Sequence, residues 1–199
     1  MDFNSYFASV EQQMDETLRG KPIVVAPVET DSTCAIAASY EAKAFGIKTG
    51  TPIHEAKRLC QDIIVVQAKH EQYVKFHEKV VEEIERHYPV QIVGSIDEMG
   101  CLLDDKHAEE RVALDLGRRI KAGVIRRMGE CMRCSVGIAP NYFLAKVASE
   151  LTKPDGLEVI RLREMPGRLA HLKLGDLPGI GRSMEPRLRA AGIRNFVDL

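Results

Sequence analysis

The stretch Gly94-Ser95-Ile96-Asp97-Glu98-Met99-Gly100 decides the fold, because it sets two adjacent carboxylates between two apolar segments. The first apolar segment is Val90–Val93 and the second is Cys101–Leu103. Carboxylates at the end of a buried strand cost several kcal/mol each to desolvate unless a metal ion, an Arg or a Lys meets them. The alternative is a surface turn, since Asp and Glu often end strands.

A third acid, Asp2, bears on the choice between a cation site and a surface turn. Asp2 stands near the start of the chain and is followed by the aromatic residues Phe3, Tyr6 and Phe7. An amphipathic helical pattern then runs over Ala8–Leu18. If Asp2 comes close to the first pair of acids, three carboxylates converge, and such a cluster requires a cation.

The composition indicates a folded chain without a strongly basic surface. With 199 residues, 45% apolar content and 15 glycines, the chain can form one substantial core or two small ones. The formal net charge is −1, so the whole chain is not the basic body expected of a free-standing nucleic-acid binder. Any nucleic-acid binding must therefore be local.

The cysteines favour a reducing cytoplasm, because they are five in number and no signal peptide precedes them. Cys131 and Cys134 have the spacing of a redox or zinc motif. No second pair and no nearby His completes a zinc site, so we interpret them as core cysteines. No apolar run approaches the roughly 20 residues of a membrane span, which predicts a soluble protein without a membrane partner.

Hydrophobic periodicity predicts an alternation of helices and strands. The predicted helices are residues 8–18, 40–46, 52–60, 71–88, 108–128 and 141–151, and the predicted strands are residues 22–28, 34–39, 63–66, 90–93, 101–103, 134–139 and 157–160. Tyr40 and Lys43 are three residues apart in a predicted helix, so an aromatic ring and a cation should project together. The histidines of the 71–88 helix are expected to be solvated.

One sheet accounts for most of these strands. Taking Phe3, Val90–Val93, Cys101–Leu103 and Cys134–Ala139 together gives a split βαβ plan, in which residues 19–66 are an insertion. Asp2 and the acids at positions 97 and 98 can then meet on neighbouring central strands. From position 174 the composition changes to a small helix-hairpin-helix pattern.

The segments that carry a family resemblance are Asp2–Glu11, Tyr40–Gly46, Ser95–Glu98, Cys134–Asn141, Leu144–Lys146, Lys153–Gly156 and Leu177–Gly181. In these segments the chain resembles the Y-family (translesion) DNA polymerases over essentially its whole length, and it is similar to a DNA polymerase IV-like or UmuC-like catalytic fragment. Each motif alone is weak, but together they stand in the order and spacing of the family.

The resemblance implies an α+β fold with three domains. A ferredoxin-like split βαβ palm would comprise residues 1–18 and 67–155, with an inserted α/β fingers domain at residues 19–66. Residues 156–199 would form a truncated helical thumb with the helix-hairpin-helix. The little-finger domain, which grips the duplex in the family, is expected to be absent from this chain. Binding to primer-template DNA by this chain is then expected to be weak.

The implied function is template-directed, low-fidelity DNA synthesis past DNA damage, a part of DNA repair and mutagenesis. The catalytic residues implied by the resemblance are Asp2, Asp97 and Glu98, which with the main-chain carbonyl of Phe3 would hold two Mg²⁺ ions. Magnesium takes hard oxygen ligands, and two such ions stabilise the attacking and leaving oxygens of nucleotidyl transfer.

The resemblance also implies binding residues and partners. Phe7, Tyr40, Lys43 and Lys146 would bind the deoxynucleoside triphosphate, with Phe7 as a steric gate against the ribose 2′-hydroxyl. Gly179, Ile180 and Gly181 would contact a DNA phosphate through backbone N–H groups. The expected protein is a cytoplasmic, nucleoid-associated monomer that binds primer-template DNA, and a sliding clamp through a C-terminal region that this chain lacks. The alternatives are that Phe7 is core, Lys146 a solvated helix residue and Tyr40 a packing residue.

The sequence departs from the family pattern in places. Lys43 stands where Arg is usual, although a UmuC-like branch of the polymerase V type carries Lys there and Asn at the place of Asn4. Ala37 replaces a common hydroxyl residue, and Met99 stands where Ala is usual. Asp2 directly follows Met1, so the first strand is shortened.

Two further functions stay open on the sequence alone. One is a non-catalytic, polymerase-like adaptor in a DNA damage-tolerance complex. The other is a nucleotide cyclase with a similar palm, against which the thumb pattern argues. The three acids and the lysines favour the polymerase, because a scaffold has no need of a buried carboxylate cluster.

Overall fold

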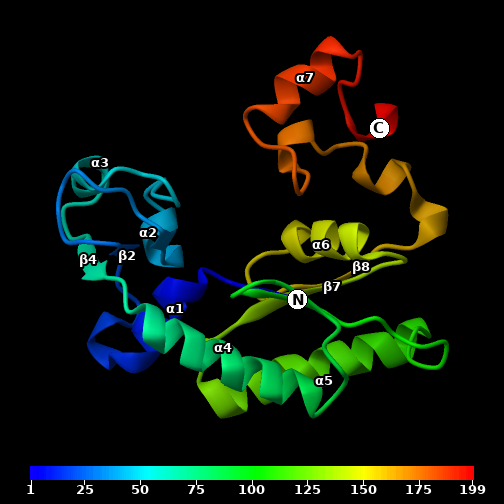
Figure 1. Cartoon of the computed structure of the whole chain (residues 1–199), viewed down its shortest axis with the longest axis horizontal. Helices are drawn as coiled ribbons and strands as arrows, with labels where there is room; N and C mark the ends of the chain where they lie inside the picture. The colour runs from blue at the N-terminus through cyan, green and yellow to red at the C-terminus, as the bar shows by residue number, and fades with distance from the viewer. The chain divides into compact units, whose positions relative to one another are not determined.

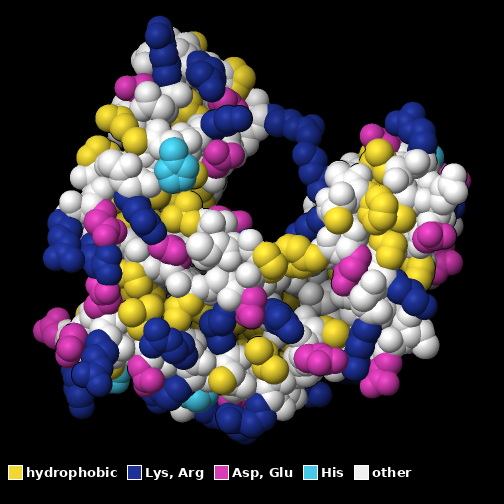
Figure 2. All heavy atoms as spheres, turned by 180° about the vertical axis from the view of Figure 1, so that it is seen from behind, with side chains coloured by type: hydrophobic (Ala, Val, Ile, Leu, Met, Phe, Trp, Pro, Cys, Tyr) yellow, Lys and Arg dark blue, Asp and Glu magenta, His cyan; other side chains and the backbone are white.

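The computed structural model describes residues 1–199, which form two compact units, each built of helices and strands. One unit comprises residues 3–134, and the other comprises residues 1–2 and 135–199. Figure 1 follows the chain through both units. On the face shown in Figure 2, Lys and Arg side chains are interspersed with Asp and Glu, in keeping with the low net charge. No helix combines the length and the apolar character that crossing a membrane would demand.

The 3–134 unit contains a small three-stranded sheet with its own core. Its strand order is β3-β2-β4, where β2 is Ile23–Ala26, β3 is Ala37–Ala38 and β4 is Ile64–Gln67. Strand β2 pairs antiparallel with β3 and parallel with β4. The short helices α2 (Tyr40–Lys43) and α3 (Ile53–Leu59) belong to the same segment. All buried apolar residues of this core lie between positions 24 and 60, so the segment predicted as fingers has a core of its own.

Longer helices make up most of the remaining 3–134 unit. Helix α1 is Tyr6–Met14, a 3₁₀ turn η1 follows at Glu16–Leu18, and α4 is His70–Glu85. Helix α5 is Glu110–Met128 and packs alongside α4 (Figure 1). At Gly123 on α5, an added Cβ would collide with the end of the Glu83 side chain of α4, which would have to move.

The predicted helix at residues 8–18 therefore differs at both ends. Asp15 leaves the helix in an extended conformation (φ −123°, ψ 105°), and its side chain accepts hydrogen bonds from the N–H and hydroxyl of Thr17. An Asp side chain that bonds its neighbouring backbone competes with helix continuation, so α1 stops at Met14.

The acidic stretch folds as a hairpin in the 3–134 unit. Strand β5 (Ile92–Ser95) pairs antiparallel with β6 (Glu98–Gly100), and Ile96 and Asp97 form the turn. The predicted strand at Cys101–Leu103 is wrong, because the tight turn starts the second strand directly at Glu98. The predicted burial of the approaching strand is also wrong, since every residue of β5 is exposed. The surface-turn alternative describes this backbone.

The 135–199 part holds a β-α-β element. Strand β7 (Cys134–Ile138) pairs in parallel with β8 (Leu157–Val159), and α6 (Tyr142–Leu151) connects them. The Asn141 side chain caps α6 by accepting from the Leu144 N–H at 2.8 Å. A Cβ at Gly137 on β7 would collide with the Ala145 carbonyl of α6, so helix and strand are in backbone contact there.

Short helical turns follow β8. They are η2 (Leu162–Glu164), η3 (Gly167–Leu169), η4 (Leu174–Asp176), α7 (Met184–Ala190) and η5 (Phe196–Asp198). Their apolar residues pack with those of α6 in one core, which includes the fully buried Leu169 and Leu174. Gly179 has φ +83°, the left-handed conformation that glycine adopts without strain, in the turn before α7.

Candidate active site

The Asp97 turn is held by three hydrogen bonds within the 3–134 unit. The Phe3 N–H donates to the Asp97 carbonyl at 2.9 Å, and Nδ1 of His77 donates to the Ile96 carbonyl at 2.8 Å. The Ser95 hydroxyl donates to the Asp97 carboxylate at 2.5 Å. These bonds fix the backbone of the turn from two other elements. His77 is thus a structural residue, and the expectation that it is solvated is wrong.

The two acids of the hairpin are half-buried. Glu98 begins β6 and is followed by the fully buried Met99, as expected when successive side chains point to opposite faces of a strand. Burial, followed by the negative charge of Asp97, raises the pKa of the Tyr6 hydroxyl. The Asp97 carboxylate therefore acts electrostatically on the aromatic start of α1.

Asp2 is a buried carboxylate, 5% exposed, that is held by two lysines. The ammonium group of Lys146 bonds one oxygen, and that of Lys153 bonds the other at 2.5 Å. Both lysines also contact the Glu150 carboxylate, at 3.0 and 2.8 Å. Burial raises the pKa of the Asp2 carboxyl, but the hydrogen bonds from Lys146 and Lys153 outweigh burial and hold that pKa below its usual value.

Lys153 is the residue that the sequence reasoning missed. The segment Lys153–Gly156 is one of the segments that resemble the family, but the sequence alone assigns no role to its first residue. Helix α6 ends at Leu151, so Lys153 leaves the helix and turns back toward the same carboxylate that Lys146 reaches. The side chain of Lys146 is only 18% exposed, which makes the alternative of a solvated helix residue wrong.

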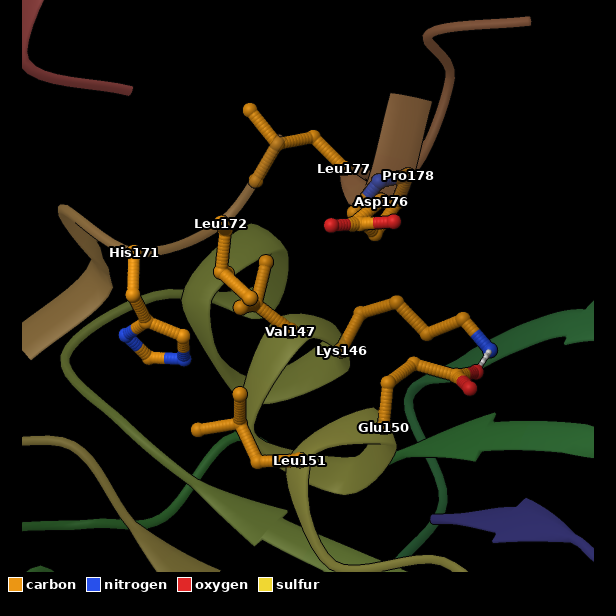
Figure 3. Close-up of a pocket in the computed structure, with 9 residues that line it drawn as sticks. All are labelled: Lys146, Val147, Glu150, Leu151, His171, Leu172, Asp176, Leu177 and Pro178. Carbon is orange, nitrogen blue, oxygen red and sulfur yellow. Dashed lines mark hydrogen bonds and ion pairs between the residues drawn. The ribbon is translucent and has the colours of Figure 1, made fainter. Parts of the chain in front are cut away.

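A pocket of about 500 Å³ lies beside α6 in the same unit (Figure 3). Val147 and Leu151 of α6 and Leu172 of the following segment give it apolar walls. Lys146 and Glu150 stand at one end, and their charged groups point toward each other. The pocket is therefore lined by the methylene chain of Lys146, while the ammonium group is engaged by carboxylates.

Phe7 is half-buried on α1 and stacks on Tyr73 of α4. The ring centroids are 4.5 Å apart with an interplanar angle of 27°, and the Tyr6 ring lies 5.8 Å away on the same helix. Tyr73 itself is fully buried. Phe7 is thus a partly exposed ring on an aromatic support, and the alternative of a core residue does not describe it.

Tyr40 and Lys43 project together, as predicted. The Lys43 ammonium group lies over the Tyr40 ring, 4.4 Å from its centroid, and Lys43 is exposed. The Ser39 hydroxyl accepts from the Ala42 N–H at 3.2 Å and so caps the short helix α2 that carries both residues. The pair forms a cationic and aromatic surface on the small-sheet segment.

The glycines of the predicted phosphate contact lie in the turn before α7. Gly179 and Gly181 are exposed, whereas the Ile180 N–H donates to the Leu177 carbonyl at 3.1 Å. The Ile180 N–H is therefore used inside the turn. Contact of this turn with DNA stays a prediction.

The candidate metal ligands have the right chemistry for magnesium. The carboxylates of Asp2, Asp97 and Glu98 and the carbonyl of Phe3 are hard oxygen donors, which Mg²⁺ prefers. No group of three or more His, Cys, Asp or Glu side chains in residues 1–199 is arranged as a metal site. The convergence of Asp2 with the two hairpin acids stays a prediction.

The fold is the α+β fold of a DNA polymerase catalytic core, as comparison with solved structures shows. The chain matches the insertion ternary complex of Dbh DNA polymerase with a TM-score of 0.86 and 32% identity, over 98% of this chain and 57% of that one. It matches DinB from Sulfolobus solfataricus with a TM-score of 0.84 and 33% identity, over the same shares.

Residues 1–150 match the impB/mucB/samB family, and the chain belongs to this family. It is 38% identical to DNA polymerase IV of Moorella thermoacetica over 205 residues, which cover all of this chain and 50% of that protein. It is 34% identical to DNA polymerase IV of Saccharolobus solfataricus, over all of this chain and 56% of that protein. The predicted resemblance to Y-family, polymerase IV-like proteins is confirmed, and the chain spans about half the length of these relatives.

Proposed function

We propose that this chain is the catalytic core of a template-directed, low-fidelity DNA polymerase that carries out two-metal nucleotidyl transfer in translesion synthesis. The observation that carries the proposal is the Asp2 carboxylate, which is buried and bonded by two ammonium groups. A scaffold needs no such group, whereas phosphoryl chemistry needs both carboxylates and cations at one place. The similarity to DNA polymerase IV supports the same function.

In this proposal, residues 1–18 and 67–155 are the palm, residues 19–66 the fingers and residues 156–199 a partial thumb. The separate core at residues 24–60 supports the fingers, whereas the core at residues 144–177 extends across the boundary proposed between palm and thumb. A ferredoxin-like split βαβ palm would bring Asp2 close to Asp97 and Glu98. The hydrogen bond from Phe3 to the Asp97 backbone supports that placement, because Phe3 directly follows Asp2.

The reaction joins a primer to an incoming nucleotide. The primer 3′-hydroxyl oxygen forms a bond to the α-phosphorus, the bond from that phosphorus to the bridging oxygen breaks, and pyrophosphate leaves while the hydroxyl proton passes to solvent. Two bound Mg²⁺ ions, held by Asp2, Asp97, Glu98 and the Phe3 carbonyl, would stabilise the charge on the phosphoryl oxygens.

The chain's own side chains would bind and select the nucleotide. Lys146 and Lys153 can exchange their carboxylate partners for phosphate oxygens, since an ammonium group is a compact charge on a flexible stem. The Tyr40 and Lys43 pair would meet the other side of the triphosphate. The half-buried Phe7 ring would leave no room for a ribose 2′-hydroxyl, which selects deoxynucleotides.

The test is primer extension with Mg²⁺ by the unmodified protein and by Asp97→Ala. We expect metal-dependent extension that Asp97→Ala lowers by about a hundredfold or more. Asp105→Ala is the matched control, because Asp105 is an exposed acid in the loop after the hairpin. Binding of primer-template DNA without any extension by the unmodified protein would contradict the proposal and favour the non-catalytic adaptor.

A further inference from the structure

Glu11 is a fully buried acid on α1, with 0% exposure, that the proposed chemistry does not use. The Lys69 ammonium group bonds one carboxylate oxygen at 2.5 Å, and the Tyr73 hydroxyl donates to the other at 2.8 Å. The side chain of Lys69 is half exposed, whereas Tyr73 is fully buried. Glu11 is thus compensated by one cation at the surface and one neutral donor in the interior.

Tyr73 is tied to α1 at both ends of its side chain. Its hydroxyl reaches Glu11, and its ring stacks on Phe7 at 4.5 Å. Phe7 and Glu11 are four residues apart and lie on the same face of the helix, one turn from each other. A third bond, from the Tyr6 hydroxyl to the Tyr73 carbonyl at 2.8 Å, fixes the Tyr73 backbone. These contacts together fix the position of the Tyr73 ring along the length of α1.

We propose that Glu11 and Tyr73 are positioning residues for sugar selection, with Glu11 acting through Tyr73 on the ring of Phe7. This inference rests on the proposed role of Phe7 as the wall that excludes a 2′-hydroxyl. Steric exclusion of a single hydroxyl needs a wall held to within about 0.5 Å. The Phe7 ring is half-buried, and its stacking partner is Tyr73.

A buried carboxylate is an unusual way to pack two helices. An apolar side chain at position 11 would bury area between α1 and α4 without a desolvation cost. It would also leave the Tyr73 hydroxyl without its acceptor, and the ring could then slide or tilt along the helix. The carboxylate accepts a hydrogen bond from the Tyr73 hydroxyl, and hydrogen bonds are directional. This bond fixes the position of the Tyr73 ring relative to Phe7.

The experiment measures kcat/KM for a deoxynucleotide and for its ribonucleotide, and reports their ratio for each variant. Tyr73→Leu, which removes the stack, should lower this ratio about three- to tenfold. Tyr73→Phe keeps the ring and removes the hydroxyl, and Glu11→Met removes the acceptor. Both should lower the ratio about twofold. Glu11→Gln keeps a carbonyl oxygen for the hydroxyl and should restore the ratio toward that of the unmodified protein.

Matched controls separate positioning from general stability. Tyr88→Phe removes a hydroxyl that accepts from the Asp104 N–H at 2.9 Å, and Glu83→Gln changes a buried acid of α4. Neither residue has a ring contact or a hydrogen bond with Phe7, so both variants should keep the unmodified ratio even where the melting temperature falls. If Tyr73→Leu and Glu11→Met also keep that ratio while Phe7→Ala lowers it, the inference is overturned and the proposed function stands. If Phe7→Ala leaves the ratio unchanged, the proposed gate fails and the inference fails with it.

Discussion

Two buried acids, Glu11 in the 3–134 unit and Asp2 in the other, are compensated in different ways. Glu11 has one lysine and one tyrosine hydroxyl as partners. Asp2 has two lysine ammonium groups, and both of these also contact Glu150. Glu11 accepts a hydrogen bond from Tyr73, whose fully buried side chain cannot turn to another acceptor. Asp2 is joined only to flexible cations that already share another anion.

This difference indicates that Glu11 has a structural role, whereas the lysine partners of Asp2 can be exchanged for another anion. Removal of Asp2 from its lysines leaves each ammonium group with the Glu150 carboxylate, and a phosphate oxygen can take the same place. Removal of Glu11 leaves the buried Tyr73 hydroxyl without an acceptor, at the full desolvation cost of that group. The two sites should therefore respond in opposite ways to substitution, Asp2 in activity and Glu11 in stability.

The largest expected effect is on activity. Asp2→Asn should lower primer extension about a hundred- to thousandfold, because it removes a charged oxygen ligand from the proposed metal site. Glu11→Gln should keep extension of a correct deoxynucleotide within about threefold of the unmodified protein, since it keeps the shape and a hydrogen-bond acceptor. Single-turnover extension with Mg²⁺ measures both, and equal losses in the two variants would contradict the distinction between the acids.

The second effect is on the free energy of unfolding, which the Glu11 variant should lower more than the Asp2 variant. Glu11→Ala should lower the free energy of unfolding by about 2–4 kcal/mol, from the cavity and the unsatisfied Tyr73 hydroxyl together. Asp2→Asn should lower it by less than Glu11→Ala does, because both lysines keep the Glu150 carboxylate as a partner. Urea unfolding followed by circular dichroism gives both values. A larger loss for Asp2→Asn would show that its ion pairs are structural.

A glycine offers a way to disturb the Asp2 site without touching a charge. Gly137→Ala would place a Cβ against the Ala145 carbonyl of α6, so the helix must shift away from β7. Overpacking of this kind costs about 1–3 kcal/mol. The shift moves Lys146 on the same helix, so KM for the nucleotide should rise as well. Gly167→Ala is the control, because an added Cβ there meets nothing within 4 Å.

Much of the fold could be predicted from the sequence, because long periodic segments dominate it. Helices α4, α5 and α6 lie within three residues of their predicted ends. The strand at residues 101–103 could not be placed correctly, since an apolar run signals burial but not pairing. The hairpin turn, which depends on hydrogen bonds from Phe3 and His77, decides the pairing instead.

Site residues could be predicted from the sequence where they belong to one local motif. They could not be predicted where their hydrogen-bond partners lie far away in the sequence. Tyr40 and Lys43 are neighbours on one helix, so their joint projection follows from spacing alone. Glu11 was indistinguishable from a solvated helix residue, because its partners Lys69 and Tyr73 lie about sixty positions away. Lys153 was hidden for the same reason, since Asp2 is at the other end of the chain.

The smallest expected effect is a pH dependence of stability that belongs to Asp2. Its folded pKa lies below the usual 3.8, so its ion pairs stabilise the fold fully above that value and lose this contribution as pH falls through the folded pKa. The difference in unfolding free energy between the unmodified protein and Asp2→Asn should therefore stay constant from about pH 7 to about pH 5 and shift against the unmodified protein in acid. Asp15, Asp104 and Glu164 also have pKa values lowered by hydrogen bonds, but they are present in both proteins and cancel in the difference. Urea titrations of both proteins from about pH 7 to below the usual pKa of 3.8 measure this difference, and a difference that stays constant over that whole range would show that Asp2 has the same proton affinity in the folded and unfolded states.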